Sequence, residues 1–184
     1  MTDFQVQKDI VRQFHGELAV ARTDDMSRVL SRWLTPDHLW RGMHPWNEIS
    51  GPHALAEAFW LPLQASFSHL DRRMDVFFAG HNAIAGVGGT WVVSMGHLAG
   101  LFDAPWLGIR PTGKLTLMRY AEFMRVEGTR IAETAMFVDI PHLMIQAGQS
   151  PFPTQTAAHL VQPGPATHDG LLYGRQPEDE GVRT

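Results

Sequence analysis

The spacing of apolar residues changes once along this chain, and that change constrains the fold more than any other feature. Up to residue 70, apolar side chains recur every three or four positions, as on the buried face of a helix. From Met74 onward, β-branched and aromatic residues gather in four strand-like segments: 74–78, 83–98, 115–126 and 131–140. Helices followed by strands predict an α+β fold, with the helices packed on one face of an antiparallel sheet.

The helical part divides into about three helices. Two short amphipathic helices are expected over residues 6–18 and 26–33. Residues 37–51 mix tryptophan, glycine, histidine and proline, which suits an irregular strand or loop better than a helix. A third helical run is expected over residues 52–70, in which Pro62 either kinks the helix or begins a new turn.

Beyond Gly148 the composition changes to a Pro- and Gly-rich tail. We therefore expect one domain over residues 1–148, long enough for a sizeable core, and a tail over residues 149–184. The tail still carries apolar residues such as Phe152 and Leu171. Part of it is therefore expected to pack on the body or on a partner subunit.

Charge and composition exclude several classes of partner. The formal net charge is −4 and the pI is near 6.2, so no basic surface is expected for nucleic acid or an anionic membrane. No apolar run is long enough to span a membrane and the N-terminus does not resemble a signal peptide, so the expected location is the cytoplasm. The chain has no cysteine, and its ten histidines are scattered. Neither a metal nor another cofactor is expected, and the expected partner is a small organic molecule.

Several short motifs occur in a recognisable order. They are Gly51–Pro52 ahead of a helix, the glycine-punctuated Gly96–Gly100, the Pro-Thr-Gly turn within Gly108–Lys114, and a closing run from Arg130 to Gly148. In this order the chain, over roughly residues 5–148, resembles the SnoaL-like polyketide cyclases of the nuclear-transport-factor-2-like superfamily. The segment Leu101–Leu107 is longer than is usual in that family and is expected to form a lid or a dimer contact.

The resemblance implies a conical fold, in which the curved sheet wraps round the helices and leaves an internal pocket. It also implies a homodimer formed through the outer face of the sheet. It does not fix the reaction, because one fold hosts many activities. The acid-base aspartate of the reference cyclases and its asparagine, glutamine and histidine neighbours fall at Met136, Trp40, Tyr120 and Glu122. None of those residue types is retained, so the cyclase mechanism is not expected here.

Glu122 is the first candidate for an acid or base, because it interrupts the apolar run Tyr120–Met124 and falls on a pocket position of the family. A carboxylate in apolar surroundings has a raised pKa and can carry protons near neutral pH. If a two-residue hairpin turn is centred on Glu127–Gly128, Glu133 lies opposite Glu122, and the two carboxylates could supply an acid and a base. A three-residue turn would separate their faces. In the alternative interpretation Glu122 lies on a solvated face and pairs with an arginine: Arg73, Arg119 or Arg125.

Histidine and aromatic residues complete the expected site. His44 lies between two tryptophans in Trp40–Trp46 and is expected either to donate to a substrate carbonyl or to relay a proton to Glu122. Six tryptophans in a chain of this size suit a cavity for a flat or apolar ligand, although they also suit a plain core. The expected ligand-binding residues are Trp40, Trp46, Tyr120, Met136, Trp91 and His97.

Three functions remain open at this point. The first is a cofactor-independent enzyme that moves a proton on a small hydrophobic or carbonyl-bearing metabolite, as a lyase, isomerase or cyclase, through Glu122, His44 and Glu133. The second is a small-molecule-binding protein without catalysis, which the loss of the reference catalytic residues favours. The third is an assembly module whose tail wraps a partner.

Overall fold

The computed structural model describes residues 4–84, 88–154, 164–165 and 167–175. Its helices are α1 (Gln5–Val20), α2 (Met26–Trp33), α3 (Pro52–Leu55), α4 (Leu61–Ser66) and α5 (Ile140–Gln146), with single turns of 3-10 helix at Thr23–Asp25 and π helix at Ala56–Trp60. Its strands are β1 (Leu34–Arg41), β2 (Glu48–Ser50), β3 (Phe67–Asn82), β4 (Gly89–Phe102), β5 (Leu115–Glu127) and β6 (Arg130–Val138). The helices precede the four long strands as expected, except that β1 and β2 lie between α2 and α3 and that α5 follows β6.

The third helical run ends earlier than its apolar spacing predicts. The helix α4 stops at Ser66 and β3 begins at Phe67, although the helical spacing continues to Leu70. Phe67 pairs with Phe102 at the end of β4, and their rings stack with centroids 4.6 Å apart. This long-range contact fixes Phe67 in a strand and overrides the local pattern.

All six strands belong to one sheet, in the order β2-β1-β6-β5-β4-β3. Neighbouring strands are antiparallel except β1 and β6, which are parallel. The expectation of a purely antiparallel sheet is therefore wrong at this pair. The reason is that β1 directly follows α2 and most of the chain separates it from β6. No hairpin connects these two strands, so they need not be antiparallel.

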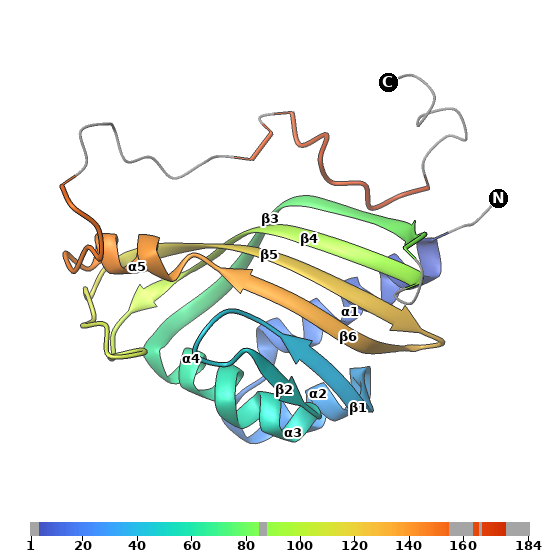
Figure 1. The fold of residues 1–184 in the computed structure, drawn as a ribbon, viewed down its shortest axis with the longest axis horizontal. Coiled ribbons are helices and arrows are strands. Elements are labelled where there is room, and N and C mark those ends of the chain that lie inside the picture. Colours follow the sequence, from blue (N-terminus) through green and yellow to red (C-terminus); the bar gives the residue numbers. More distant parts are fainter. Residues whose placement is uncertain (1–3, 85–87, 155–163, 166, 176–184) are drawn as a thin grey trace.

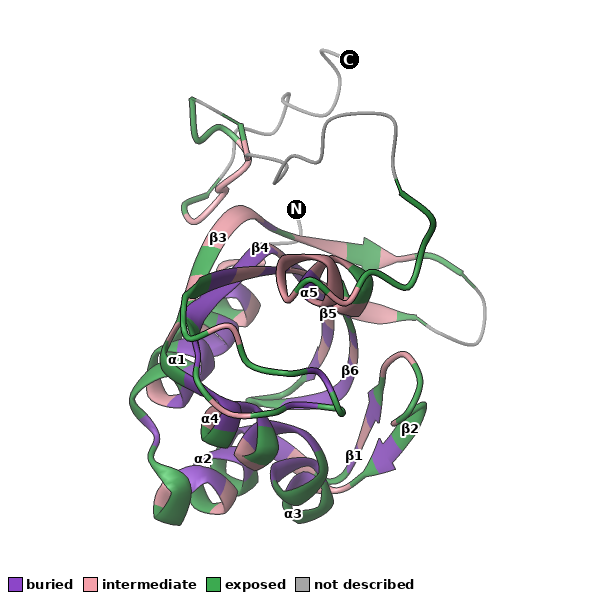
Figure 2. Ribbon diagram, turned by 90° about the vertical axis from the view of Figure 1, so that its left-hand side faces the viewer, coloured by how far each residue is buried: buried purple, intermediate pink, exposed green. Residues whose placement is uncertain are grey.

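The sheet curves round the helices and gives the molecule the expected conical α+β shape (Figure 1). Along β5 every second residue is buried, which is the pattern of a strand with one face turned to the core. Figure 2 shows buried segments along the concave side of the sheet, with α1, α2 and α4 beside them. The largest fully buried side chains on this side include Trp40, Phe59, Tyr120, Met118 and Met124.

Part of the C-terminal tail lies on the body of the same chain. The amide of Phe77 in β3 donates to the carbonyl of Gly170, and the amide of Leu172 donates to the carbonyl of Phe77, both at 2.7 Å. These bonds run along β3, which is the last strand of the sheet. The remainder of the expected tail, residues 155–163, 166 and 176–184, lies outside the described residues.

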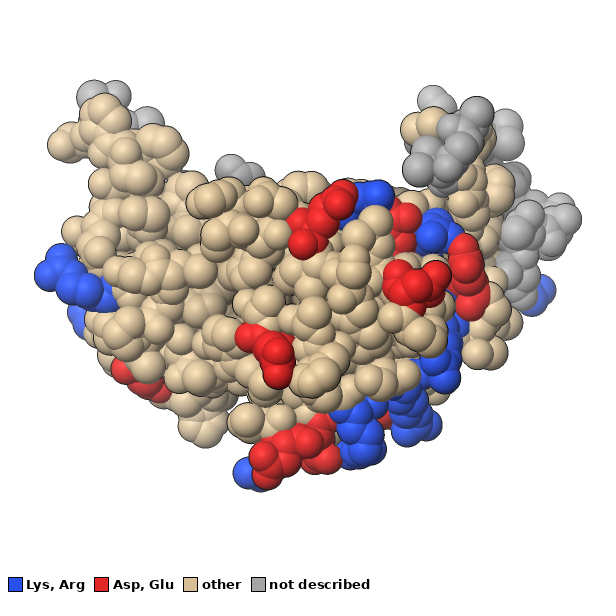
Figure 3. Space-filling view, turned by 60° about the horizontal axis from the view of Figure 1, so that its bottom comes forward, with Lys and Arg blue, Asp and Glu red and all other residues tan. Residues whose placement is uncertain are grey.

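The surface carries charges of both signs. On the face seen in Figure 3, Lys and Arg side chains are interleaved with Asp and Glu side chains rather than forming one broad basic patch. Among the described residues, no helix has both the length and the apolar character needed to cross a membrane.

Candidate functional site

Glu122 lies inside the cone. Buried residues alternate with more exposed ones along β5, and Glu122 is one of the buried residues. It pairs with Ser94 on β4 and Met136 on β6. Only 1% of its surface is exposed. The alternative interpretation, in which Glu122 lies on a solvated face, is therefore wrong. The pairing register places the carboxylate in the core together with the apolar residues around it.

Two side chains from distant parts of the chain bind the carboxylate of Glu122. His15 Nε2, from α1, lies 3.0 Å from Oε2, and Arg72 Nη1, from β3, donates to the same oxygen at 2.7 Å. The side chain of His15 is 5% exposed and that of Arg72 is 10% exposed. The site is thus a buried cluster of carboxylate, imidazole and guanidinium, made by one helix and two strands.

The expectation of a raised pKa for Glu122 is wrong, because burial, the largest single effect, is outweighed by the charges and hydrogen bonds of Arg72 and His15 together. Burial by itself raises the pKa, but these neighbours bring it to about 2. Burial, with a contribution from Arg72, lowers the pKa of His15. Near neutral pH the cluster therefore holds a carboxylate, a neutral imidazole and a guanidinium.

Two polar atoms of this cluster keep unused hydrogen-bonding capacity. A neutral His15 that donates its Nε2 proton to Glu122 leaves Nδ1 as an acceptor. Within the described part of the chain, His15 Nδ1 and Arg72 Nη2 are both buried without a hydrogen-bond partner. Buried polar groups normally have partners, so an unpaired acceptor and an unpaired cationic donor in one cluster indicate a place for a ligand or a water molecule.

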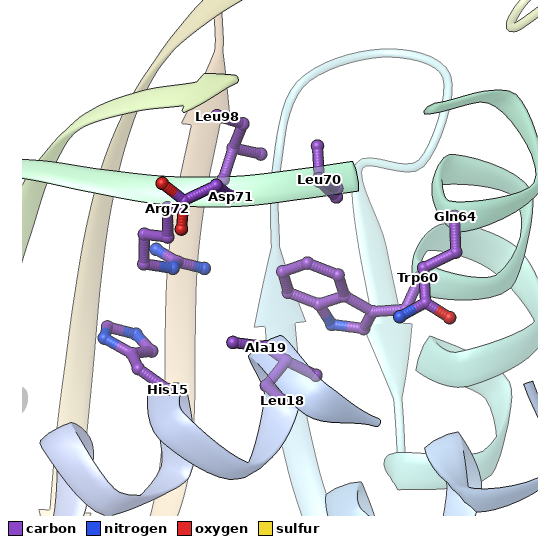
Figure 4. Close-up of a pocket in the computed structure, with 9 residues that line it drawn as sticks. All are labelled: His15, Leu18, Ala19, Trp60, Gln64, Leu70, Asp71, Arg72 and Leu98. Atoms are coloured by element: carbon purple, nitrogen blue, oxygen red, sulfur yellow. The ribbon is translucent and has the colours of Figure 1, made fainter. Parts of the chain in front are cut away.

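A small cavity lies beside the cluster. Its volume is about 40 Å³, which is room for about two or three water molecules. Figure 4 shows His15 and Arg72 reaching toward each other from α1 and β3, with Trp60 across the cavity. The remaining lining residues are Leu18, Ala19, Gln64, Leu70, Asp71 and Leu98. The cavity accepts a small head group, whereas a whole substrate of ordinary size needs several hundred Å³.

Tyr120 and Ser94 form a second polar pair inside the cone. Tyr120 Oη and Ser94 Oγ are 2.7 Å apart, and the guanidinium of Arg72 lies 4.5 Å from the centre of the Tyr120 ring. Burial raises the pKa of Tyr120, so its hydroxyl keeps its proton. The ring and the carboxylate of Glu122 together fix the position of Arg72.

Glu133 does not face Glu122. The hairpin turn consists of Gly128 and Thr129, and an irregularity between Arg125 and Val126 shifts the register, so that Glu122 pairs with Met136 and Glu133 pairs with Arg125. Arg125 Nε lies 3.2 Å from Glu133 Oε2, and Arg41 makes a further ion pair with Glu133. The expected pair of carboxylates is therefore wrong, because the actual register turns Glu133 to the other face of the sheet.

The expected histidine and tryptophans lie in several different places. His44 is exposed in the turn between β1 and β2, and His15 is the histidine that contacts Glu122. Trp40 and Trp46 pack against Phe59, with ring centroids 5.1 Å away in each case. Trp106, from the expected lid segment Leu101–Leu107, packs on Trp46 and is 2% exposed. These aromatic rings fill the core beside the cavity and do not line it.

Trp91 and His97 lie on the outer face of the sheet. They pair across the strands with Arg125 and Arg119, and they alternate with the inward residues of β4. His97 Nδ1 lies 3.3 Å from Asp75 Oδ2, while Trp91 lines an open hollow of about 380 Å³ on the outer face. Of the six expected ligand-binding residues, Tyr120, Met136 and Trp40 are fully buried on the inner side of the sheet.

His15 and Arg72 were not found from the sequence. His15 is four residues after Val11 and three before Leu18, both buried, so it is a polar residue on the apolar stripe of α1. A histidine among the buried apolar residues of one helix face was the sequence signal from which His15 could have been found. Arg72 lies between the expected helical run, which ended at residue 70, and the expected strand, which began at Met74, so the sequence held no comparable signal for it. Among the described residues, no three His, Asp or Glu side chains are grouped to hold a metal ion.

No protein-family model and no curated protein matches this sequence. Solved structures do match its fold. A protein from Jannaschia sp. CCS1, provisionally described as a SnoaL-like polyketide cyclase, matches with a TM-score of 0.59 and 22% identity, over 82% of this chain and 95% of that chain. A Bacillus subtilis protein, provisionally described as an isomerase, matches with a TM-score of 0.57 and 16% identity, over 82% and 98%.

A third solved structure, a Catenulispora acidiphila protein with a ketosteroid isomerase-like fold in complex with trimethylamine, matches with a TM-score of 0.53 and 11% identity, over 76% of this chain and 92% of that chain. At sequence identities this low, the similarity shows a shared fold and nothing about activity. The chain therefore has the fold of solved structures that are described as a SnoaL-like polyketide cyclase and as a protein with a ketosteroid isomerase-like fold.

Proposed function

We propose that this protein is an enzyme that moves a proton within a small hydrophobic or carbonyl-bearing metabolite without a cofactor, as a lyase, isomerase or cyclase. The observation that carries the proposal is the buried cluster of Glu122, His15 and Arg72 beside a cavity. Two of its polar atoms, His15 Nδ1 and Arg72 Nη2, have no partner among the described residues. An unpaired base next to an unpaired cationic donor suits proton removal beside a carbonyl group.

In this mechanism His15 is the base and Glu122 orients it. His15 Nδ1 takes a proton from the carbon next to a substrate carbonyl, and the electron pair of the broken C–H bond moves onto the carbonyl oxygen. Arg72 Nη2 donates a hydrogen bond to the oxyanion that forms. Glu122 stabilises the imidazolium cation, because its carboxylate accepts a hydrogen bond from Nε2–H. Return of the proton from Nδ1 to another atom of the substrate completes an isomerisation.

The test is hydrogen exchange catalysed on a panel of neutral ketones and β-keto esters in deuterated water, followed by loss of the C–H signal in NMR spectra. The protein is expected to accelerate exchange for at least one compound, and His15→Gln and Glu122→Gln are expected to abolish that acceleration. His53→Gln, at an exposed histidine of α3, is the matched control. Exchange that persists undiminished in folded His15→Gln protein would rule out His15 as the base.

A second candidate function is ligand binding without catalysis, and the state of Glu122 favours it. Arg72 already neutralises this carboxylate, and the cavity of about 40 Å³ holds only a small head group. A pure binder is expected to gain thermal stability from its ligand to the same extent in wild type and in His15→Gln protein, with no turnover in either. Turnover that depends on His15 would exclude this alternative.

We also propose that the protein forms a homodimer through the outer face of its sheet. Phe78 is 39% exposed and Phe137 is 50% exposed on that face. Trp91 and Phe123 line the open hollow beside Phe78. Exposed apolar surface of this kind commonly marks an interface between proteins, and a second copy would remove it from water.

A further inference from the structure

The tail segment Gly170–Gly174 joins two elements that carry the candidate site. On one side it pairs with β3, where Phe77 and Leu171 form a parallel bridge and the amides of Phe77 and Leu172 are both hydrogen bonded. The last strand of a sheet has one row of unpaired backbone groups, and this segment covers part of that row. The tail is thus hydrogen bonded to the strand that carries Arg72.

On its other side the same segment is held by α1. Lys8 Nζ donates to the carbonyls of Leu172 and Gly174 at 2.8 and 2.6 Å, and Gln5 Nε2 donates to the carbonyl of Tyr173 at 2.9 Å. Lys8 is only 5% exposed, so these carbonyls solvate a charge that is costly to bury alone.

The ring of Tyr173 lies between α1 and β3. The guanidinium of Arg12 is 4.8 Å from its centre, and the ring of Phe77 is 5.3 Å away. A single tail residue therefore contacts both elements, and its backbone and side chain take part in the same junction.

The contacts on α1 lead directly to the candidate site. Gln5, Lys8 and Arg12 are spaced three and four residues apart, and His15 is the next residue on the same helical stripe. On β3 the docked residue Phe77 is five positions from Arg72. The hydrogen bond from His15 to Glu122 requires α1 to stay close to the inner face of the sheet. Within the described residues, the tail segment is far from α1 and β3 in the sequence and bridges the two.

We propose that Gly170–Gly174 acts as a clamp that regulates the candidate site, because its docking holds α1 against β3 and so keeps His15 on Glu122. Release of the clamp loosens α1, lengthens the contact between His15 and Glu122, and takes the base out of position. This inference concerns the geometry of the site and rests on the proposed function only for its effect on turnover. Small displacements of a catalytic group can cost large factors in rate.

The test uses full-length protein with the double substitution Lys8→Met and Tyr173→Ala, and Asp169→Ala, at an exposed tail residue, as the matched control. NMR hydrogen exchange is measured at the Leu172 amide, at the His15 Nε2 proton, and at core amides of β5 and β6. Loss of the clamp contacts is expected to speed exchange at Leu172 and at His15 by about tenfold or more, since about 1.4 kcal/mol corresponds to tenfold.

A local effect distinguishes the clamp from simple stabilisation of the fold. In both the wild-type protein and the double variant, the Leu172 amide and the His15 proton are expected to exchange together and much faster than the β5 and β6 amides, because the clamp opens without global unfolding. Exchange of Leu172 and His15 only at the slow rate of the β5 and β6 amides, a His15 proton that stays protected while Leu172 opens, or a Leu172 amide that stays protected in the double variant would each overturn the proposal. None of these readouts depends on turnover, so failure of the proposed enzymatic function leaves the test of the clamp intact.

Discussion

At the scale of single residues, the protein keeps a carboxylate charged inside a hydrophobic core. Glu122 stays ionised there because Arg72 and His15 replace the water it has lost. A buried ion pair adds little net stability compared with apolar residues, but the loss of one partner leaves a charge that nothing compensates. The cluster is therefore maintained at an energetic cost, which is common at functional sites and unusual in a plain core.

The first prediction concerns Arg72. Arg72→Met should lower the free energy of unfolding by about 3–5 kcal/mol, because Glu122 then keeps a buried charge without its partner. The double variant Arg72→Met and Glu122→Met should recover much of that loss. The comparison variant is Arg28→Met, whose exposed pair with Asp25 should contribute little to stability. Urea denaturation measures all three, and equal losses for Arg72→Met and Arg28→Met would contradict a buried cluster.

The second prediction concerns pH and His38. Burial lowers the pKa of His38 from 6.5 to about 4, and the bond to the Ile131 carbonyl offsets this only in part. The unfolded chain then binds a proton more readily than the folded one, so this contribution is complete above pH 6.5 and is lost as the pH falls toward 4. His15 acts in the same direction, since burial lowers its pKa as well.

Urea denaturation at several pH values measures this effect. His38→Gln should flatten the fall in unfolding free energy between pH 6.5 and 4 by up to about 3 kcal/mol, since one pKa unit corresponds to about 1.4 kcal/mol. An unchanged dependence on pH would show that His38 is protonated equally easily in the folded and unfolded chains. His53→Gln, at an exposed histidine, provides the comparison.

At the scale of elements, close approach of β3 and β4 fixes where Arg72 lies. The two strands pair along most of their length, with a shift in register between Met74 and Val76. Gly96 faces that shift, and a Cβ atom at this position would lie 1.9 Å from the carbonyl oxygen of Arg73. The absence of a side chain at Gly96 thus lets β3 follow β4 through the irregularity and bring Arg72 to Glu122.

The third prediction tests this element. Gly96→Ala should lower the free energy of unfolding by about 1–3 kcal/mol, because the added methyl group forces the two strands apart. Gly80→Ala, in β3, has open space around the added carbon and should be neutral or slightly stabilising. Thermal unfolding compares them. Equal stability of both variants would mean that β3 and β4 can separate without cost.

At the scale of the whole molecule, one face of the sheet encloses the site and the other is left with exposed apolar side chains.

The fourth prediction follows from the proposed dimer. Phe137→Glu should convert the protein to a monomer, because it places a charge in an apolar interface. Val20→Glu is the control, since Val20 is 77% exposed at the end of α1. Analytical ultracentrifugation measures the mass, and an unchanged mass for Phe137→Glu would exclude this interface.

The sequence alone determined the α+β class, because this follows from hydrophobic spacing, and the resemblance to the SnoaL-like family implied the conical fold. The sequence left two positions open for Glu122, and the structure decided for the buried one. Only the tertiary structure decided the partners of Glu122, since one register shift turned Glu133 away and helix packing brought His15 across the cone. It also decided the protonation state of Glu122. A pKa depends on neighbours that are distant in the chain, and local sequence contains no record of them.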